Sequence, residues 1–355
     1  MAAGGFFIFA AKFEFNAETR MKFYNKMAQL MNNGVSLNVA LHQVATIGKK
    51  DKGSVLPKLF LLWKKQVTNG MNLGYCMAPY IPTAEAMLIE TGANSGQLAK
   101  SMMDAYESVE QQGRVKKAII SNGSYPVLLL CVLLAAMFLT SYEVIPTFAN
   151  VLPVNEWTGV SYGVARAAFF FKDWSVVILG LLAMVFIIIG FSLPRWTSQA
   201  RIKFDNVFPW NIYRMWQGSA FLLSVASLMS AGVKLDEVSL NRIARKADPY
   251  LAQRIRAVRK WILSGVNFGE ALHKTGYNFP DEELIADLRV YATLKGFEQN
   301  LVNVTREWVT SIEEKVTAYM KIVNFVTLVL IAIVIGMLIS ALFGVVQQIQ
   351  TSAQV

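Results

Sequence analysis

The sequence predicts an all-α, polytopic membrane protein with two homologous cytoplasmic helical bundles and three transmembrane helices. Three observations favour this fold class. The 355 residues are 54% hydrophobic and only 16% charged, whereas about a quarter of the residues in soluble domains are charged. Three uncharged apolar runs are long enough to cross a bilayer. Two more hydrophilic regions carry the same motifs in the same order.

The N-terminal segment, residues 1–19, contains the apolar stretch GGFFIFAA. This stretch is too short to span a membrane and lacks the basic start and cleavage pattern of a signal peptide. Two interpretations stay open. It is an interfacial or docking segment, or it is a buried first strand or turn.

The first cytoplasmic domain, residues 20–117, has a helical apolar pattern. Phe23, Met27, Leu30 and Met31 fall at i, i+4, i+7 and i+8 and form one core-facing stripe. Gly34 then supplies a residue that ends a helix in a left-handed conformation without a Cβ penalty. Similar stripes elsewhere, joined by short glycine turns, predict small antiparallel helical bundles.

Three transmembrane helices are predicted at residues 118–145, 174–194 and 322–347. None of these runs shows the polar face that a soluble core helix presents at 3.6-residue spacing. A periplasmic loop at 146–173 and a periplasmic tail at 348–355 complete the order of segments.

Charge placement predicts the orientation. Residues 1–117 carry 14 basic and 8 acidic side chains, residues 195–321 carry 18 and 13, and the loop between the first two spans carries two and three. The positive-inside rule therefore places the N-terminus and both larger regions in the cytoplasm and the C-terminus outside. The basic charge belongs to the cytoplasmic side, so nucleic acid is not needed to explain it.

The second cytoplasmic domain, residues 195–321, repeats the first. LMNNGVSL at Leu30 becomes LMSAGVKL at Leu228, and NGMNLG at Asn69 becomes SGVNFG at Ser264. The nearly constant offset predicts a duplicated unit of a helical domain followed by a span. We assign a structural role to the motif positions of both copies: Gly34, Leu37, Gly70, Gly74, Pro82, Gly92 and Gly96 in the first, and Gly232, Leu235, Gly265, Gly269, Pro280 and Gly296 in the second.

Sequence signatures of catalysis are missing. The chain has no Walker-type phosphate loop and no HExxH, GxSxG or CxxC motif. His42 and His273 have no partner at metal-ligand spacing, and Cys76 and Cys131 cannot form a disulfide framework. We therefore expect no enzyme activity and no catalytic, cofactor or metal site.

Two features are candidates for binding. Small residues recur every four positions in the third span, which lets helix backbones approach closely in lipid. They are expected to pack against the other spans, a second copy or a helix of a partner protein, and they are Ala332, Gly336, Ser340 and Gly344. Residues 242–260 carry seven basic side chains and one Asp. Solvent, anionic lipid or an acidic partner protein could face the outward side chains of this segment, expected to be Arg254, Arg256, Arg259 and Lys260.

Taken together, these features resemble the type II secretion system F family, the inner-membrane platform proteins of type II secretion and type IV pilus machines. The resemblance rests on tandem LMxxGVxL and GxNxG motifs and on the order of domains and spans, from about Arg20 to Gln350. TGANSGQL at Thr91 matches a family turn, but Ala93 replaces its usual acidic residue, so a cation seen in some relatives is in doubt and no ligand is assigned. This drift hints at the type IVb or thin-pilus branch.

The resemblance implies a bacterial inner-membrane platform that couples a cytoplasmic assembly ATPase to pilin or pseudopilin polymerisation. Its expected partners are that ATPase, pilins, other inner-membrane assembly proteins, the bilayer and further copies of itself, and not nucleic acid. A transporter or channel subunit is the alternative. Against this alternative, the spans contain no buried ionisable residue of the kind that transport usually requires, and Glu143 sits at the outer edge of the first span, where it can reach water.

Overall fold

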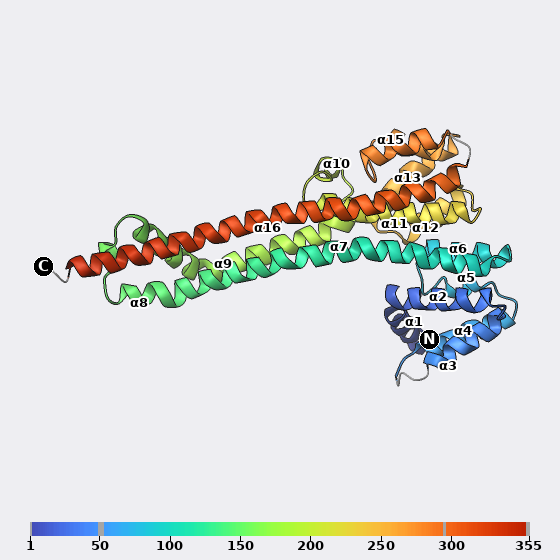
Figure 1. The fold of residues 1–355 in the computed structure, drawn as a ribbon, viewed down its shortest axis with the longest axis horizontal. Helices are drawn as coiled ribbons and strands as arrows, with labels where there is room; N and C mark the ends of the chain where they lie inside the picture. Colours follow the sequence, from blue (N-terminus) through green and yellow to red (C-terminus); the bar gives the residue numbers. More distant parts are fainter. Residues whose placement is uncertain (1, 49–52, 294–295, 353–355) are drawn as a thin grey trace. The chain divides into compact units, whose positions relative to one another are not determined.

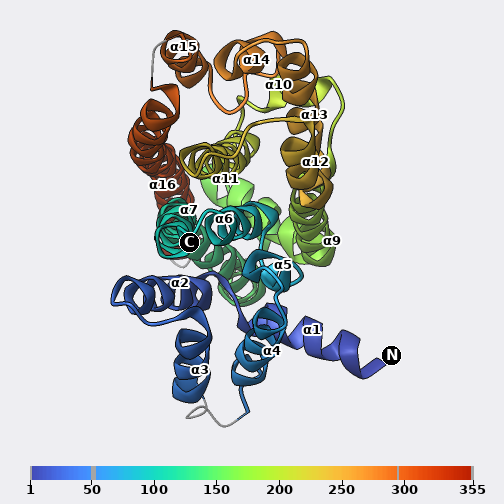
Figure 2. The same cartoon turned by 90° about the vertical axis from the view of Figure 1, so that its right-hand side faces the viewer.

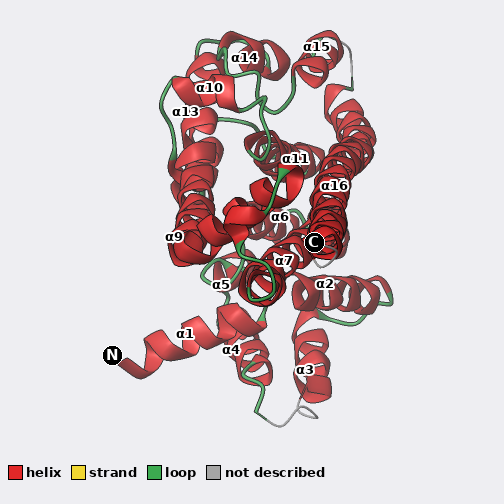
Figure 3. Cartoon of the chain, turned by 90° about the vertical axis from the view of Figure 1, so that its left-hand side faces the viewer, coloured by secondary structure: helices red, strands yellow, loops and turns green. Residues whose placement is uncertain are grey.

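The structure is a computed structural model that describes residues 2–48, 53–293 and 296–352. Every regular element in these ranges is helical (Figure 3). Three helical segments, Leu98–Ala149, Gly159–Arg195 and Asn300–Thr351, are long and apolar enough to cross a membrane. The predicted all-α, three-span fold class is confirmed.

The chain forms two compact units. Unit 1 comprises Met1–Lys117 and Leu193–Glu313, and unit 2 comprises Ala118–Ser192 and Glu314–Val355. Both hydrophilic regions that the sequence analysis paired thus belong to unit 1, and the three apolar runs belong to unit 2.

The first repeat of unit 1 is drawn from blue to cyan in Figure 1. The N-terminal segment is a helix rather than a strand or turn, and two antiparallel helices, α3 and α4, pack closely beside α2 (Figure 2). The elements are α1 (Ala2–Glu14), α2 (Ala17–Asn32), α3 (Leu37–Gly48), α4 (Leu56–Thr68), α5 (Leu73–Met77), α6 (Thr83–Asn94) and the start of α7 (Leu98–Leu139).

Four aromatic rings from α2, α4 and the α1–α2 junction fill the centre of this repeat. Phe23 stacks on Phe60 with ring centroids 4.9 Å apart, and Phe15 meets Trp63 edge-on at 5.4 Å. All four side chains are buried. Aromatic pairs at these distances add to the stabilisation that burial itself provides, so this cluster holds the ends of three helices together.

The second repeat of unit 1 follows the second span. Its longest helix, α11, buries an apolar face that includes Phe221, Leu222 and Val225. The elements are α10 (Ala200–Phe204), α11 (Trp210–Ser230), α12 (Glu237–Lys246), α13 (Pro249–Leu263), α14 (Phe268–Lys274), α15 (Glu282–Tyr291) and the start of α16 (Phe297–Ser352).

The two repeats contact each other inside unit 1, where α6 packs against α11 and α12 (Figure 2). An Arg242 guanidinium N–H donates to Glu90 over 2.8 Å, and Lys246 Nζ donates to the Ala78 carbonyl, also over 2.8 Å. Both bonds join α12 of the second repeat to the α5–α6 region of the first. The contact therefore combines helix packing with a polar rim.

Unit 2 contains the membrane-spanning parts of α7, α9 (Gly159–Arg195) and α16. Polar contacts link them: Asn122 donates to Thr317 Oγ1 over 3.3 Å, Ser161 Oγ donates to the Ala341 carbonyl over 2.8 Å, and the Tyr142 and Ser175 hydroxyls lie 3.0 Å apart. Polar side chains that pair inside a span hold helices together where apolar matching gives no preference over lipid.

A small folded cap joins the first two spans. It contains a π-helical turn, η1 (Thr140–Val144), then α8 (Ile145–Ala149) and the 3₁₀ turn η2 (Val154–Glu156). Pro146 cannot donate the helical hydrogen bond to Tyr142, which fits a widened turn at this point. Ile145, Leu152 and Trp157 of this cap pack with Val345 of α16 as one buried cluster.

Candidate functional site

The repeated LMxxGVxL phrase forms the same helix C-terminus in both copies. Gly34 has φ +80° and Gly232 has φ +82°. In the first copy the Val35 N–H donates to the Leu30 carbonyl over 3.0 Å, and in the second Val233 donates to Leu228 over 2.9 Å. This six-to-one bond is the Schellman motif, in which an apolar residue after the glycine packs back on the helix. The phrase is therefore a structural stop signal, which explains its leucine, glycine and valine together.

The other paired glycines behave alike. Gly70 and Gly265 have φ +87° and +81°, and Gly96 and Gly296 have φ +72° and +77°. A side chain is strained in this left-handed region of backbone space. The motif leucines Leu37 and Leu235, each at the end of its LMxxGVxL phrase, are half-buried. Leu37 begins α3, and Leu235 lies just before α12.

A second pair of glycines allows close helix packing. A Cβ on Gly74 would lie 2.5 Å from the Glu90 backbone nitrogen, and a Cβ on Gly269 would lie 2.4 Å from the Leu288 carbonyl oxygen. The same contact, α5 on α6 and α14 on α15, therefore recurs in each repeat. Only a residue without a Cβ fits, because an added atom would overlap backbone that cannot move away.

The asparagine of each GxNxG motif caps the short helix that follows. Asn72 Oδ1 accepts from the Gly74 N–H over 2.8 Å, and Asn267 Oδ1 accepts from Glu270 over 2.9 Å. An N-cap of this kind satisfies a backbone donor at the helix start. These two residues were missing from the sequence prediction, although an Asn directly before an apolar helix is a recognisable signal.

The remaining motif positions differ between copies. Pro82 precedes α6 as its N-cap, and a Cβ on Gly92 would meet Ser101 Oγ at 2.1 Å, so Gly92 allows α6 and α7 to approach. In the second repeat, Pro280 packs on Gly218, whose added Cβ would lie 2.2 Å from the proline Cβ. The duplicated scaffold thus keeps its turns and varies the packing between them.

The prediction that Arg254 faces outward is wrong. Its side chain is only 1% exposed, and one of its guanidinium nitrogens lies 2.7 Å from Asp205 Oδ2. Arg254 precedes the buried Ile255 on α13, and its ion-pair partner Asp205, at the C-cap of α10, makes the burial of the guanidinium tolerable. The other three predicted positions do reach solvent: Arg256 and Lys260 are exposed, and Arg259 is partly exposed and 3.7 Å from Glu237.

Asp205 is the centre of a buried ionic cluster that the sequence did not reveal. Its carboxylate also lies 3.1 Å from an Arg201 guanidinium nitrogen and accepts from the Tyr250 hydroxyl over 3.1 Å. The Arg254 guanidinium stacks 3.4 Å from the centre of the Tyr250 ring. Burial lowers the pKa of Arg201, which Asp205 opposes, and burial raises the pKa of the Tyr250 hydroxyl. Two cations and one anion are enclosed together.

The first repeat buries a different ionic group. Both carboxylate oxygens of Glu85 accept from Arg20, over 2.9 and 3.2 Å, and the Tyr24 hydroxyl donates to Glu85 over 2.6 Å. Burial raises the pKa of Glu85, with Arg20 and Tyr24 acting in the opposite direction. Because both carboxylate oxygens of Glu85 have donors from α2, these bonds tie α2 to α6.

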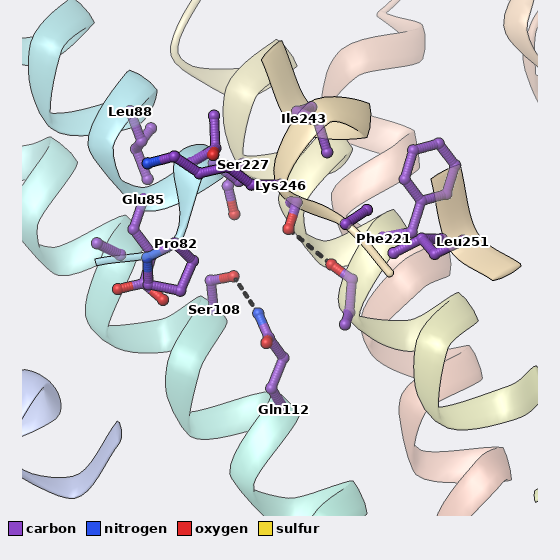
Figure 4. A pocket seen from close by; sticks show the side chains of 16 residues that line it. Pro82, Glu85, Leu88, Ser108, Gln112, Phe221, Ser227, Ile243, Lys246 and Leu251 are labelled. Atoms are coloured by element: carbon purple, nitrogen blue, oxygen red, sulfur yellow. Dashed lines mark hydrogen bonds between the residues drawn. The ribbon is translucent and has the colours of Figure 1, made fainter. Parts of the chain in front are cut away.

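A cavity of about 180 Å³ lies between the two repeats of unit 1 (Figure 4). Its lining is mixed: Pro82, Glu85 and Ser108 come from the first repeat, and Phe221 and Lys246 come from the second. Gln112 donates to Ser108 Oγ over 3.3 Å along one wall. No group of three or more metal-ligating side chains occurs among the residues the structure describes.

The small residues of α16 divide into two environments. A Cβ on Gly344 would lie 2.4 Å from Ser161 Oγ of α9. Nothing lies within 4 Å of a Cβ on Gly336, and Ala332, Gly336 and Ser340 are exposed. The face of α16 that packs within the chain carries Ala341 and Val345 instead. Only the last residue of the predicted stripe therefore packs within the chain.

Comparison with known proteins supports the duplication. The model of the family "Type II secretion system (T2SS), protein F" matches residues 23–146 and again residues 221–344. The chain is also 22% identical over 337 residues to the toxin coregulated pilus biosynthesis protein E of Vibrio cholerae serotype O1, which covers 94% of this chain and 97% of the relative. The two family matches span more than half of the chain and start at equivalent positions of the two repeats.

With its duplicated helical domains, its three spans and both halves matched by one family model, the chain belongs to the type II secretion system protein F family, whose members are the inner-membrane platform proteins of pilus and secretion machines.

Proposed function

We propose that this platform assembles a type IV pilus and couples a cytoplasmic ATPase to the addition of pilin subunits. The observation that carries the proposal is the match of the family model to both repeats. The V. cholerae relative, aligned over nearly the whole of both chains, is a pilus biosynthesis protein, which favours a pilus over a secretion pseudopilus. Unit 1 lies in the cytoplasm in this proposal and the C-terminus lies outside, in keeping with the distribution of basic residues.

The exposed basic face of α12 and α13 is the proposed contact with the ATPase. Arg245 at the end of α12, and Arg256 and Lys260 on α13, are exposed. These side chains make no contribution to the buried core, so they are free to meet an acidic surface. Electrostatic complementarity of this kind chiefly sets the association rate and the choice of partner.

Charge reversal tests this contact. Arg256→Glu with Lys260→Glu is expected to reduce co-purification of the assembly ATPase and to abolish surface pili in a strain that lacks the native gene. Lys22→Glu is the control, because Lys22 is also exposed but lies on α2 of the first repeat. Full ATPase recovery with the double variant would refute the assigned surface, and piliation in the gene deletion would refute the function.

The exposed part of the α16 stripe, Ala332, Gly336 and Ser340, is the proposed contact with a second copy of the chain or with a pilin helix. Small side chains let two helix backbones approach in lipid. Cross-linking through a cysteine at position 336, with position 333 as the matched lipid-facing control, distinguishes these partners by the mass of the product. The control is apt because Ile333 is also exposed and lies on the same turn.

A further inference from the structure

The loop that follows the second span, residues 196–210, is closed by a cluster of three aromatic rings. Trp196 is the first residue after α9, α10 then turns the chain back, and Trp210 begins α11. The ring centroids of Trp196 and Phe204 are 5.1 Å apart, and those of Phe204 and Trp210 are 5.3 Å apart. Aromatic pairs at these distances stabilise the arrangement that brings them together. The loop is therefore a compact structure and not a free linker.

A buried ionic cluster fixes this loop to the second repeat. The Arg201 guanidinium lies 5.9 Å from the centre of the Trp196 ring and 6.0 Å from that of Trp210. It is enclosed together with Asp205, whose carboxylate accepts from Arg254 of α13. Figures 2 and 3 show α10 beside α13, in agreement with this bond. The position of the loop is thus set by the core of the second repeat.

The outward side of the loop is apolar and basic. Phe204, Val207 and Phe208 are 42%, 51% and 45% exposed, and Lys203 is exposed beside them. The only acidic residue of the sequence between positions 196 and 210 is Asp205, which is fully enclosed. Exposed apolar groups gathered in one place mark a site of contact. Cations without exposed anions favour anionic lipid as that contact.

The length of the second span places the base of this loop at the membrane surface. No charged side chain lies between Asp173 and Arg195. As an α-helix this uncharged stretch is about 31 Å long, and the hydrocarbon layer of a bilayer is about 30 Å thick. The stretch therefore fills the layer and leaves Arg195 at its edge. Because Trp196 is bonded directly to Arg195, this holds for any arrangement of the two units.

Contacts to Trp196 then place the rest of the ring cluster. The layer of lipid headgroups on each side of the hydrocarbon is about 5–7 Å deep. The rings of Phe204 and Trp210 have their centroids 5.1 Å and 6.2 Å from that of Trp196. The cluster therefore lies in this layer or against it, where tryptophan is enriched in membrane proteins. The bilayer is the partner that the chain itself brings to the exposed side of the loop.

We infer that residues 196–210 form an interfacial membrane anchor, which holds Phe204, Val207 and Phe208 among the lipid headgroups. The exposed rings leave water there, and the long side chain of Lys203 reaches the lipid phosphates. Because the buried ionic cluster ties the loop to α13, this anchor fixes the start of the second repeat at the membrane surface.

Depth-dependent fluorescence quenching tests the inference in the full-length protein. The background is Cys76→Ala with Cys131→Ala, since Cys131 is exposed and would otherwise be labelled. An environment-sensitive NBD dye is attached through Val207→Cys, and separately through Phe208→Cys in case the first variant fails to fold. Each protein is placed as a single copy in phosphatidylcholine–phosphatidylglycerol nanodiscs.

Val238→Cys is the matched control. Val238 has the same side chain as Val207, is 64% exposed and belongs to the same repeat. It lies next to Glu237, which contacts Arg259 in the C-terminal part of α13 and not α10.

Lipids with a nitroxide near the headgroup are expected to quench the dye at position 207 or 208 roughly threefold more than the dye at position 238, and aqueous iodide is expected to show the reverse order. Adding Phe208→Ser to the Val207→Cys protein, which leaves the three-ring cluster intact, is expected to reduce this difference. Nitroxide quenching at positions 207 and 208 no stronger than at position 238 would overturn the inference. So would protection from iodide without nitroxide quenching, because a protein surface would then cover the loop.

Discussion

The buried cluster around Asp205 allows a quantitative prediction, because one carboxylate compensates two enclosed guanidinium groups. Asp205→Asn keeps the size of the side chain and one acceptor oxygen but removes the negative charge. Arg201 and Arg254, both 1% exposed, are then left without a counter-ion. The Tyr250 hydroxyl, which donates to Asp205 in the native protein, can offer them no charge.

The expected loss follows from the burial. Removing one partner of a fully buried ion pair costs about 3–5 kcal/mol, since the remaining charge stays desolvated. Total stability of a domain is only about 5–15 kcal/mol. For a unit of this size, roughly 2–4 °C of melting temperature correspond to each kcal/mol. The melting temperature of unit 1 should therefore fall by roughly 6–20 °C.

Thermal unfolding in detergent, followed by tryptophan fluorescence, measures this change, because Trp196 and Trp210 lie close to the Arg201 guanidinium. Glu18→Gln is the control: it removes the charge from a pair with Lys22 whose side chains are 74% and 75% exposed, and such pairs contribute little. Arg201→Met added to Asp205→Asn should recover part of the loss by removing one uncompensated cation. A shift below about 3 °C for Asp205→Asn, which is under half of the smallest expected value, would refute the reasoning.

Three further predictions concern the repeats and the spans. Gly74→Ala and Gly269→Ala should each destabilise unit 1 by about 1–3 kcal/mol, because the new methyl group overlaps backbone, whereas Gly113→Ala, where a Cβ meets nothing within 4 Å, should be neutral or stabilising; equal thermal shifts for all three would contradict this. Arg242→Glu should weaken the contact between the two repeats by about 1 kcal/mol and so increase the rate of protease cleavage in unit 1, and Glu90→Arg in the same chain should restore protection. Absence of rescue would show that this ion pair does not hold the repeats together. Gly344→Ile should lower the thermal stability of the protein by displacing Ser161, while Gly336→Ile should leave stability unchanged and reduce cross-linking to a partner; a fold defect at Gly336 would place that residue inside the chain.

The sequence by itself determined the elements that depend on local pattern. Spans are visible because a helix that crosses the bilayer must be predominantly apolar over about 20 residues. The helix ends at Gly34 and Gly232 are visible because glycine accepts their left-handed φ without strain. The duplication was also evident, since both copies must satisfy the same turns and the same close helix contacts. Each of these constraints acts within one short stretch of the chain, such as the stretch from Gly74 to Glu90.

Only the tertiary structure decided which side chains of similar helical pattern are enclosed. Arg254 and Arg256 are two residues apart, yet one meets Asp205, 49 residues away in the sequence, and the other meets solvent. Gly336 and Gly344 share one periodic stripe, but the approach of α9 covers only the second. Periodicity assigns residues to the face of a helix, whereas burial and ion pairing depend on which other helix lies against that face, and that is set by contacts between segments distant in the chain.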